Sequence, residues 1–288
     1  MSRYFADRLA KKVVFISAMT SFIVLLAIAV FIFKDGLPAF KEIGFFDFIF
    51  GTVWRPGKEH YGILTMIVGS IAVTAGSLLL AIPLGIACAI LLADVAPLKI
   101  RCFLRPLVEL LVGIPSVVYG LVGLVLLVPA VREIGGTGFS VLTASIVLMA
   151  MVLPTIISIS EDSIRAVPVS YKEGALAMGA TRWQTIWRVL LPAARSGIGT
   201  SVVLGMGRAV GETMAMIMVV GNAIIFPKTP LDPARTLTGN IAVEIMYATG
   251  LHRNALFATG IVLFIFIILL NSFAIILFKR GTHVQTIT

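Results

Sequence analysis

Six apolar stretches dominate this sequence, and each is long enough to cross a lipid bilayer as a helix, which takes about 20 residues. With 59% hydrophobic and only 13% charged residues, the chain differs from soluble domains, in which about 25% of residues are charged. We therefore expect an all-α integral membrane protein with six transmembrane helices. The six stretches are residues 13–33, 62–93, 106–130, 139–159, 198–223 and 255–278.

Two of these stretches leave room for interpretation. The second is long for a simple crossing and contains Pro83, which predicts a tilt or a kink. The first follows basic residues and includes the small residues Ala27 and Ala29, so it could be a cleaved signal peptide. Because its apolar run continues to Phe33, we favour a retained anchor. Cleavage would leave five spans in the same orientation.

The distribution of Lys and Arg predicts the orientation. With both termini placed in the cytoplasm, the inner segments hold fourteen of these residues and the outer segments hold eight. This excess follows the positive-inside rule and also accounts for the net charge of +9, so we expect no nucleic-acid partner. Two cysteines, one in a span and one in an inner loop, and three scattered histidines give no disulfide framework and no metal site.

The inner segment between the fourth and fifth stretches is too polar to cross a bilayer and has a regular pattern. Ser170 and Glu173 have the spacing of a capping box, and Thr181 and Gln184 repeat it, so two short helices are predicted. Gly179 lies between them and can adopt the positive φ that often follows a helix end. The segment is therefore expected to fold as two helices joined at Gly179.

The second of these helices is predicted to be amphipathic and to end at Pro192. On spacing alone, an ordinary connector lying on the membrane surface would look the same. The apolar residues that fall on one face are Trp183, Ile186, Trp187, Leu190 and Leu191.

The fifth stretch contains two charges, Arg208 and Glu212, four residues apart. On a continuous helix they would share one face near the middle of the bilayer, where each ion costs at least ~2.5 kcal/mol on insertion scales. Two interpretations stay open: the pair neutralises itself within the helix, or it lines the path of an anion. Gly205, Gly207 and Gly211 would let a helix or a substrate approach closely.

Glu212 would distinguish between anions if the second interpretation holds. A carboxylate accepts a hydrogen bond from a protonated oxyanion and repels one without a proton. Phosphate keeps such a proton at neutral pH, whereas sulfate does not. The residues alone leave the two interpretations of the pair equally open.

ATP is not expected to bind this chain. The pattern Gly-x-x-x-x-Gly-Lys-Ser/Thr that cradles nucleotide phosphates is missing from the sequence. The segment nearest to it, 51–59, has one residue too many between its glycines and no hydroxyl. We therefore expect no cofactor on this chain, no enzymatic activity of its own, and ATP bound by other subunits.

The inner segment resembles the EAA loop of ABC importer permeases, which in that family is the cytoplasmic coupling helix that docks into the ATPase. The resemblance rests on Glu173, Gly174, Ala175, Gly179 and the pair Leu191 and Pro192, with Gly174 and Val189 departing from the usual Ala and Ile. Neither departure removes the Glu, the Gly or the Leu-Pro. The resemblance implies that these residues couple the chain to an ATPase.

Two further motifs, GIPSVVYGL at 113–121 and GRAVGETMAM at 207–216, together resemble phosphate-specific ABC permeases of the PstC type. Arg208 and Glu212 match the charged pair that this family is thought to use for phosphate. Thr213 and Ser116 stand in the same two motifs, so the resemblance places them in the substrate pathway. The match covers nearly the whole chain from the second stretch onward.

The resemblance implies a MetI-like permease core of the type I importer class. The expected divisions are an N-terminal helix and outer segment at 1–61, the core at 62–280 with its coupling loop at 160–197, and a cytoplasmic tail at 281–288. The expected partners are a second permease subunit, either PstA-like or a second copy, two ATP-binding subunits and an external phosphate-binding protein, in the cytoplasmic membrane of a prokaryote. The alternatives are an importer of sulfate, molybdate or another oxyanion, and a secondary anion transporter that needs no ATPase.

Overall fold

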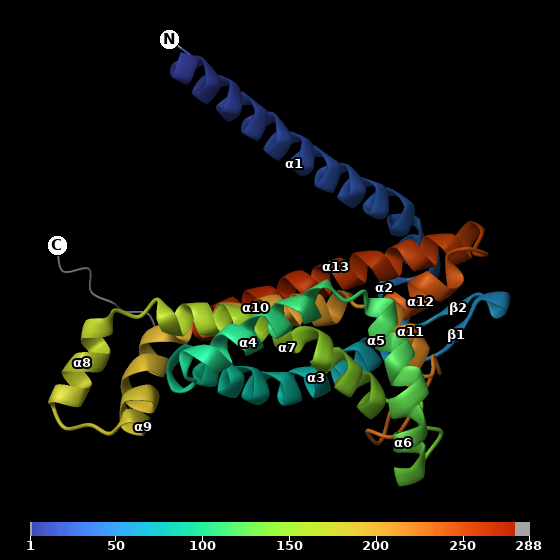
Figure 1. Ribbon diagram of the computed structural model, residues 1–288. Helices are drawn as coiled ribbons and strands as arrows, with labels where there is room; N and C mark the ends of the chain where they lie inside the picture. Colours follow the sequence, from blue (N-terminus) through green and yellow to red (C-terminus); the bar gives the residue numbers. More distant parts are fainter. Residues whose placement is uncertain (1, 280–288) are drawn as a thin grey trace.

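The computed structural model describes residues 2–279, and most of the chain in this range is helical (Figure 1). Six helical runs are long and apolar enough to cross a membrane, which confirms the predicted fold class. The predicted tail at 281–288 lies outside the described residues. The six runs are Ala10–Ile43, Leu64–Val95, Ser116–Ile134, Val141–Arg165, Arg182–Gly211 and Gly250–Ala274.

Helix α7 (Val141–Arg165) forms the centre of the bundle and packs against α3 (Leu64–Ile90) and α10 (Leu191–Gly211). Glycine lets all three helices approach closely, as is usual where transmembrane helices cross. A Cβ on Gly85 of α3 would lie 2.6 Å from Ile156 Cγ2, and one on Gly205 of α10 would lie 2.8 Å from Val152 Cγ1. Gly205 therefore serves packing as predicted, whereas a Cβ on Gly211 would meet open space.

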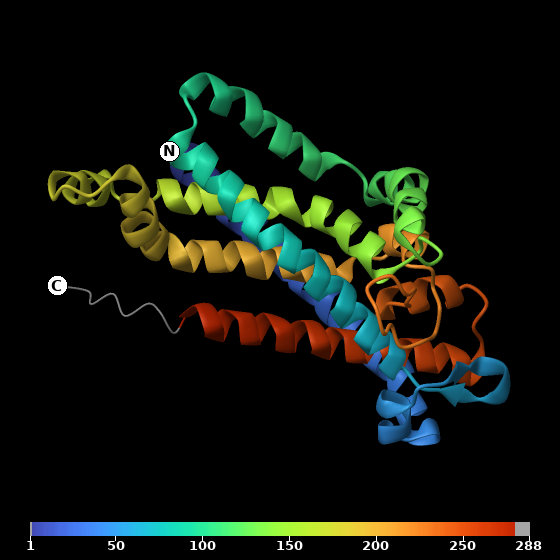
Figure 2. The ribbon, with the colours of Figure 1, turned by 90° about the horizontal axis from the view of Figure 1, so that it is seen from below.

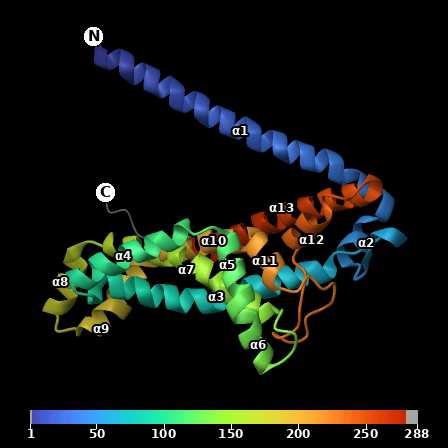
Figure 3. The ribbon, with the colours of Figure 1, turned by 45° about the vertical axis from the view of Figure 1, so that its right-hand side comes forward.

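The first helix, α1 (Ser2–Ile43), contacts the bundle only near its C-terminal end. There it packs along α13 (Gly250–Lys279), with the rings of Phe31 and Phe257 5.4 Å apart. Figures 1 and 3 show its N-terminal part standing clear of the other helices. None of its most apolar window is buried, so this chain alone does not cover it.

The two ends of the bundle differ in what they carry. The N-terminal end of α1 and the C-terminal end of α13 lie at the same end as α8 (Val169–Ala177) and α9 (Arg182–Thr185) (Figures 1 and 2). The opposite end is built from short elements. They are α2 (Phe45–Phe50), the antiparallel strands β1 (Trp54–Arg55) and β2 (His60–Tyr61) around a 3₁₀ turn (Pro56–Lys58), α6 (Val128–Ile134) and α12 (Leu237–Glu244).

Two of the apolar stretches are broken, so the prediction of continuous helices is wrong there. The third stretch is divided between α4 (Leu98–Gly113) and α5 (Ser116–Val122). Ile114 takes an extended conformation, with ψ 127, because the ring of Pro115 disfavours helical backbone in the residue before it. Within the fifth stretch, helix α10 ends at Gly211. Glu212 is extended, and the next helix is α11 (Met214–Val219).

Prolines elsewhere do not end helices. Pro83 lies inside the continuous α3, which is followed by a wide π-helical turn (Leu91–Val95). Pro192 lies in the first turn of α10, directly after another π-helical turn (Ile186–Leu190), and the run from α9 through α10 is unbroken. The prediction that Pro192 ends the helix is therefore wrong. The wide turn accommodates a residue that has no N–H to donate.

Candidate translocation site and coupling segment

The two broken helices lie against each other. A Cβ on Gly120 of α5 would lie 2.9 Å from the Cα of Ala215 in α11, so the backbones of these helices are in contact. Ser116 is the first residue of α5, and Glu212 and Thr213 form the break before α11. The structure therefore places three of the predicted pathway residues at the starts of two helices that touch.

Glu212 is held by the backbone around the break and by a neighbouring helix. Its Oε1 atom accepts a hydrogen bond from the N–H of Ala215 at 3.2 Å, so the carboxylate caps the first turn of α11. Its carbonyl oxygen accepts a hydrogen bond from the Thr238 hydroxyl at 3.0 Å. Thr213 donates its hydroxyl to the carbonyl of Gly211 at 3.2 Å, which also stabilises the break.

Arg208 lies in the last turn of α10, where the helix dipole favours a cation. Within residues 2–279 no carboxylate lies within 4 Å of its guanidinium, and it does not pair with Glu212. The interpretation as a self-neutralising pair on one helical face is wrong, because α10 ends at Gly211, before Glu212. The side chain of Arg208 is only half-buried. Its guanidinium can therefore donate two parallel hydrogen bonds to an anion that does not belong to this chain.

Tyr119 connects the two sides of the break between α4 and α5. Its hydroxyl donates a hydrogen bond to the carbonyl of Leu111 at 2.9 Å, across the break between α4 and α5. The sequence placed Tyr119 inside the motif at 113–121 but gave no reason to assign it a role, because its partner is a carbonyl eight residues earlier.

Several charges where α3, α4 and α7 meet were not singled out in the sequence, and these contact one another or backbone carbonyls in the structure. Glu161, which is 2% exposed, lies 2.5 Å from Arg165 and 3.7 Å from Arg105. Arg101 and Arg165 both donate to the carbonyl of Leu92, at 2.7 and 3.3 Å. These contacts tie together the ends of α3, α4 and α7 that lie nearest α8. Among the described residues no cluster of His, Cys, Asp and Glu could hold a metal ion.

The segment between α7 and α10 folds as two helices joined at Gly179, as predicted. The second capping box is confirmed, because Thr181 N–H donates to Gln184 Oε1 at 2.9 Å and Gln184 N–H donates to Thr181 Oγ1 at 3.2 Å. Gly179 has φ 85, which confirms its positive φ. The first capping box is wrong: Pro168 occupies the cap position of α8, and Ser170 lies inside the helix.

Most of α8 projects into open space. Glu173, Gly174 and Gly179 are exposed, and a Cβ added to either glycine would meet no atom within 4 Å. Met178 is 89% exposed, which is unusual for a large apolar side chain unless a partner covers it. One ion pair, between Lys172 and Asp94, joins α8 to the end of α3.

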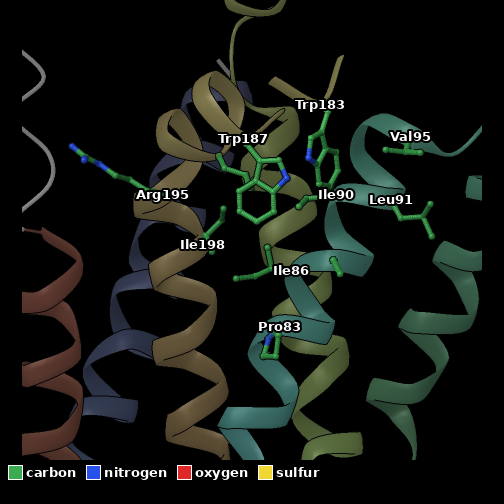
Figure 4. Close-up of a pocket in the computed structure, with 11 residues that line it drawn as sticks. Pro83, Ile86, Ile90, Leu91, Val95, Trp183, Trp187, Arg195 and Ile198 are labelled. Atoms are coloured by element: carbon green, nitrogen blue, oxygen red, sulfur yellow. The ribbon is translucent and has the colours of Figure 1, made fainter. Parts of the chain in front are cut away.

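A groove of about 640 Å³ lies between the end of α3 and the helix that starts at α9. Figure 4 shows the rings of Trp183 and Trp187 above it and Pro83 at its deep end. The two indoles are 5.6 Å apart and are 61% and 52% exposed, whereas Ile186 and Leu190 on the same helix are buried. The apolar face predicted for this helix is therefore divided between a packed side and an open groove.

The comparison with protein families decides what kind of membrane protein this is. Residues 81–282, which include both breaks and the coupling segment, match the family described as binding-protein-dependent transport system inner membrane component. The chain belongs to this family. The permease core expected from the resemblance is therefore present.

Curated relatives match over most of their length. A probable ABC transporter permease, YqgH of Bacillus subtilis, is 46% identical over 85% of this chain and 83% of its own. The phosphate transport system permease PstC of Pasteurella multocida is 32% identical over 91% of this chain and 88% of its own.

Solved structures agree on the fold. The chain resembles a chain of a bacterial alginate ABC transporter with a TM-score of 0.67 and 19% identity, over 96% of this chain and 98% of that one. It resembles a chain of the MetNI methionine ABC transporter with a TM-score of 0.61 and 22% identity, over 80% of this chain and all of that one. The fold is therefore that of MetI-type importer permeases.

Proposed function

We propose that this chain is a permease subunit of an ATP-driven ABC importer that carries inorganic phosphate across the cytoplasmic membrane. Several relatives that match over most of their length are named phosphate transport system permeases. A permease for sulfate, molybdate or another oxyanion is the alternative within the class, and an anion transporter that works without an ATPase is the alternative outside it.

The observation that carries the proposal is the state of Arg208. A cation at membrane depth is costly unless a partner or water compensates it, and no carboxylate of the described chain does so. An oxyanion fits the planar fork of a guanidinium with two parallel hydrogen bonds. Arg208 also lies one turn before the break at Glu212, and broken helices often line substrate sites in transporters.

Glu212 supplies the discrimination in this proposal. One carboxylate oxygen is occupied by the N–H of Ala215, which fixes the direction of the other oxygen. An oxygen held in this way accepts a hydrogen bond from a protonated phosphate and repels sulfate, which has no proton to donate. Ser116 and Thr213 complete the proposed pathway from the facing sides of the two breaks.

Coupling to ATP is proposed to pass through the exposed residues of α8 and the joint that follows it. Glu173, Gly174, Ala175 and Gly179 would meet an ATP-binding subunit, and the run containing Leu191 and Pro192 would transmit its movement to α10. In this proposal α8, α9 and both chain ends would lie in the cytoplasm. A second permease chain, two ATP-binding subunits and an external binding protein would complete the importer, with residues 1–61 forming an added helix and outer segment beside the core.

The test is anion selectivity in vesicles that hold the assembled transporter. Uptake of labelled phosphate should depend on ATP and should resist a large excess of sulfate. In Glu212→Gln the side chain can still cap Ala215, so the fold should persist while sulfate begins to compete. ATP-independent uptake would contradict the importer proposal. Transport of sulfate in preference to phosphate by the unaltered protein would assign the chain to another oxyanion.

A further inference from the structure

A buried cluster at the end of the molecule opposite α8 fixes the C-terminal end of α12. Glu244, which is 6% exposed, accepts hydrogen bonds from Trp54 Nε1 at 2.8 Å and from Arg235 at 2.6 Å, and its carboxylate lies 2.8 Å from His252 Nε2. These partners come from β1, from the loop before α12 and from α13. Glu244 therefore joins β1, which lies 190 residues earlier, to the segments on either side of α12.

The N-terminal end of α12 is fixed as well. The N–H of Leu237 donates to the hydroxyl of Ser70 in α3 at 2.9 Å, and Thr236 caps the helix by accepting from Gly239 N–H at 3.1 Å. Arg235 donates to the carbonyl of Asn222, just after α11, at 3.0 Å. The helix is thus held at both ends by buried polar contacts, which make it a rigid support.

Thr238, in the first turn of α12, reaches the break at the proposed substrate site. Its hydroxyl donates to the carbonyl of Glu212 at 3.0 Å, although the two residues are 26 positions apart. Thr238 is only 8% exposed, so it does not itself line an open path. The carbonyl of Glu212 is thus held by α12, while its carboxylate is held by α11.

We propose that Thr238 is a positioning residue that sets the place of Glu212, and through it the affinity and selectivity for the anion. This inference rests on the proposed function, because it assumes that Glu212 meets the substrate. Without the hydroxyl, the backbone of the break loses its contact with the rigid support. The carboxylate then no longer keeps a fixed direction, even though its charge is unchanged.

The experiment compares Thr238→Val, which keeps the shape but deletes the hydroxyl, with Thr238→Ser, which restores it. In vesicles with equal amounts of intact transporter, Thr238→Val should raise the KM for phosphate about 10-fold, as expected for one lost hydrogen bond. The maximal rate should change much less, and sulfate should compete more strongly. Thr238→Ser should return both values toward those of the unaltered protein.

A matched control is Thr259→Val in α13, because Thr259 is fully buried and its hydroxyl donates within its own helix at 2.9 Å. It should leave KM and selectivity unchanged. A double-mutant cycle with Glu212→Gln tests whether Thr238 acts through Glu212. If it does, adding Thr238→Val to Glu212→Gln should produce no further loss of selectivity. An equal KM in Thr238→Val and the unaltered protein would overturn the inference. It would also be overturned if Thr238→Val lowered selectivity as much in the Glu212→Gln variant as in the unaltered protein.

A second measurement does not depend on transport. Hydrogen exchange of the α11 amides, Ala215 above all, should speed up in Thr238→Val and not in Thr259→Val, because the cap from Glu212 weakens. If the unaltered protein carries no phosphate, the proposed function fails while this measurement still decides whether Thr238 holds the break. Unchanged exchange in Thr238→Val would show that the hydrogen bond from Thr238 does not stabilise the break.

Discussion

The break between α10 and α11 and the segment formed by α8 and α9 carry the residues assigned to the two halves of transport, and they are built in opposite ways. At the break, Glu212 is fixed by Ala215 and Thr238 of the same chain. In α8, Glu173 and Gly174 are exposed, and a Cβ on Gly174 would meet nothing within 4 Å. The first region is held by contacts within this chain, whereas the second is exposed and, in the proposed importer, would be covered by an ATP-binding subunit.

This difference predicts how substitutions act. A change at the break alters contacts that the chain makes with itself or with an anion, so its effect should persist in the purified chain. A change in α8 leaves the isolated chain unaffected and should show only when the ATP-binding subunit is present. Each prediction below tests one side of this comparison, beginning with the largest expected effect.

Arg208→Gln should abolish most transport while leaving the complex assembled. A hydrogen bond to a charged group contributes about 1.5–3 kcal/mol, and each 1.4 kcal/mol is a factor of ten, so phosphate uptake should fall by at least ~10-fold. Arg208→Lys keeps the charge but loses the fork and should retain partial activity. Uptake of labelled phosphate, normalised to intact complex, measures both variants.

The structure removes a confounding effect from this test. Had Arg208 and Glu212 been paired, the loss of one charge would leave the other buried and unpaired, which costs about 3–5 kcal/mol. Because Glu212 is held by Ala215 instead, Arg208→Gln should not lower the thermal stability of the chain by a comparable amount. Wild-type uptake in Arg208→Gln would give Arg208 a purely structural role.

Gly179→Val should reduce coupling and leave the membrane part intact. The φ of 85 at this position costs a residue with a Cβ about 1–2 kcal/mol, so the angle between α8 and α9 should change. ATP-dependent uptake and co-purification with the ATP-binding subunit should fall several-fold, and Glu173→Ala should act in the same direction. The matched control is Gly57→Ala in the turn at the opposite end of the molecule, where a Cβ would meet no atom within 4 Å. Normal co-purification in both Gly179→Val and Glu173→Ala would contradict the docking role of this segment.

Features of the fold and of the candidate site could be predicted from the sequence where they depend on residues close together in the chain. The number of spans, the positive φ of Gly179 and the Thr181 cap depend on neighbouring residues and were predicted correctly. The contact from Thr238 to Glu212 and the cluster around Glu244 join distant segments, and single-sequence patterns do not report such contacts. The break at Glu212 was missed for a different reason: apolar residues continue on both sides of it, so the helical pattern hides it.

Substitutions at the two expected capping boxes should have the smallest effect on transport. They directly test which of the two predicted boxes forms. Thr181→Ala removes a cap that is present in the structure, at a cost of about 1 kcal/mol. Helix α9 begins there and leads without interruption into α10, so a frayed start should lower ATP-dependent uptake by a factor of a few. Ser170→Ala, the same kind of change at the other expected box, should have no effect, because Ser170 makes no cap when Pro168 precedes the helix. Parallel uptake and thermal-stability measurements should therefore separate the two variants. Equal losses in both would mean that α8 starts at Ser170 once the ATP-binding subunit is bound, so that the segment changes shape on docking.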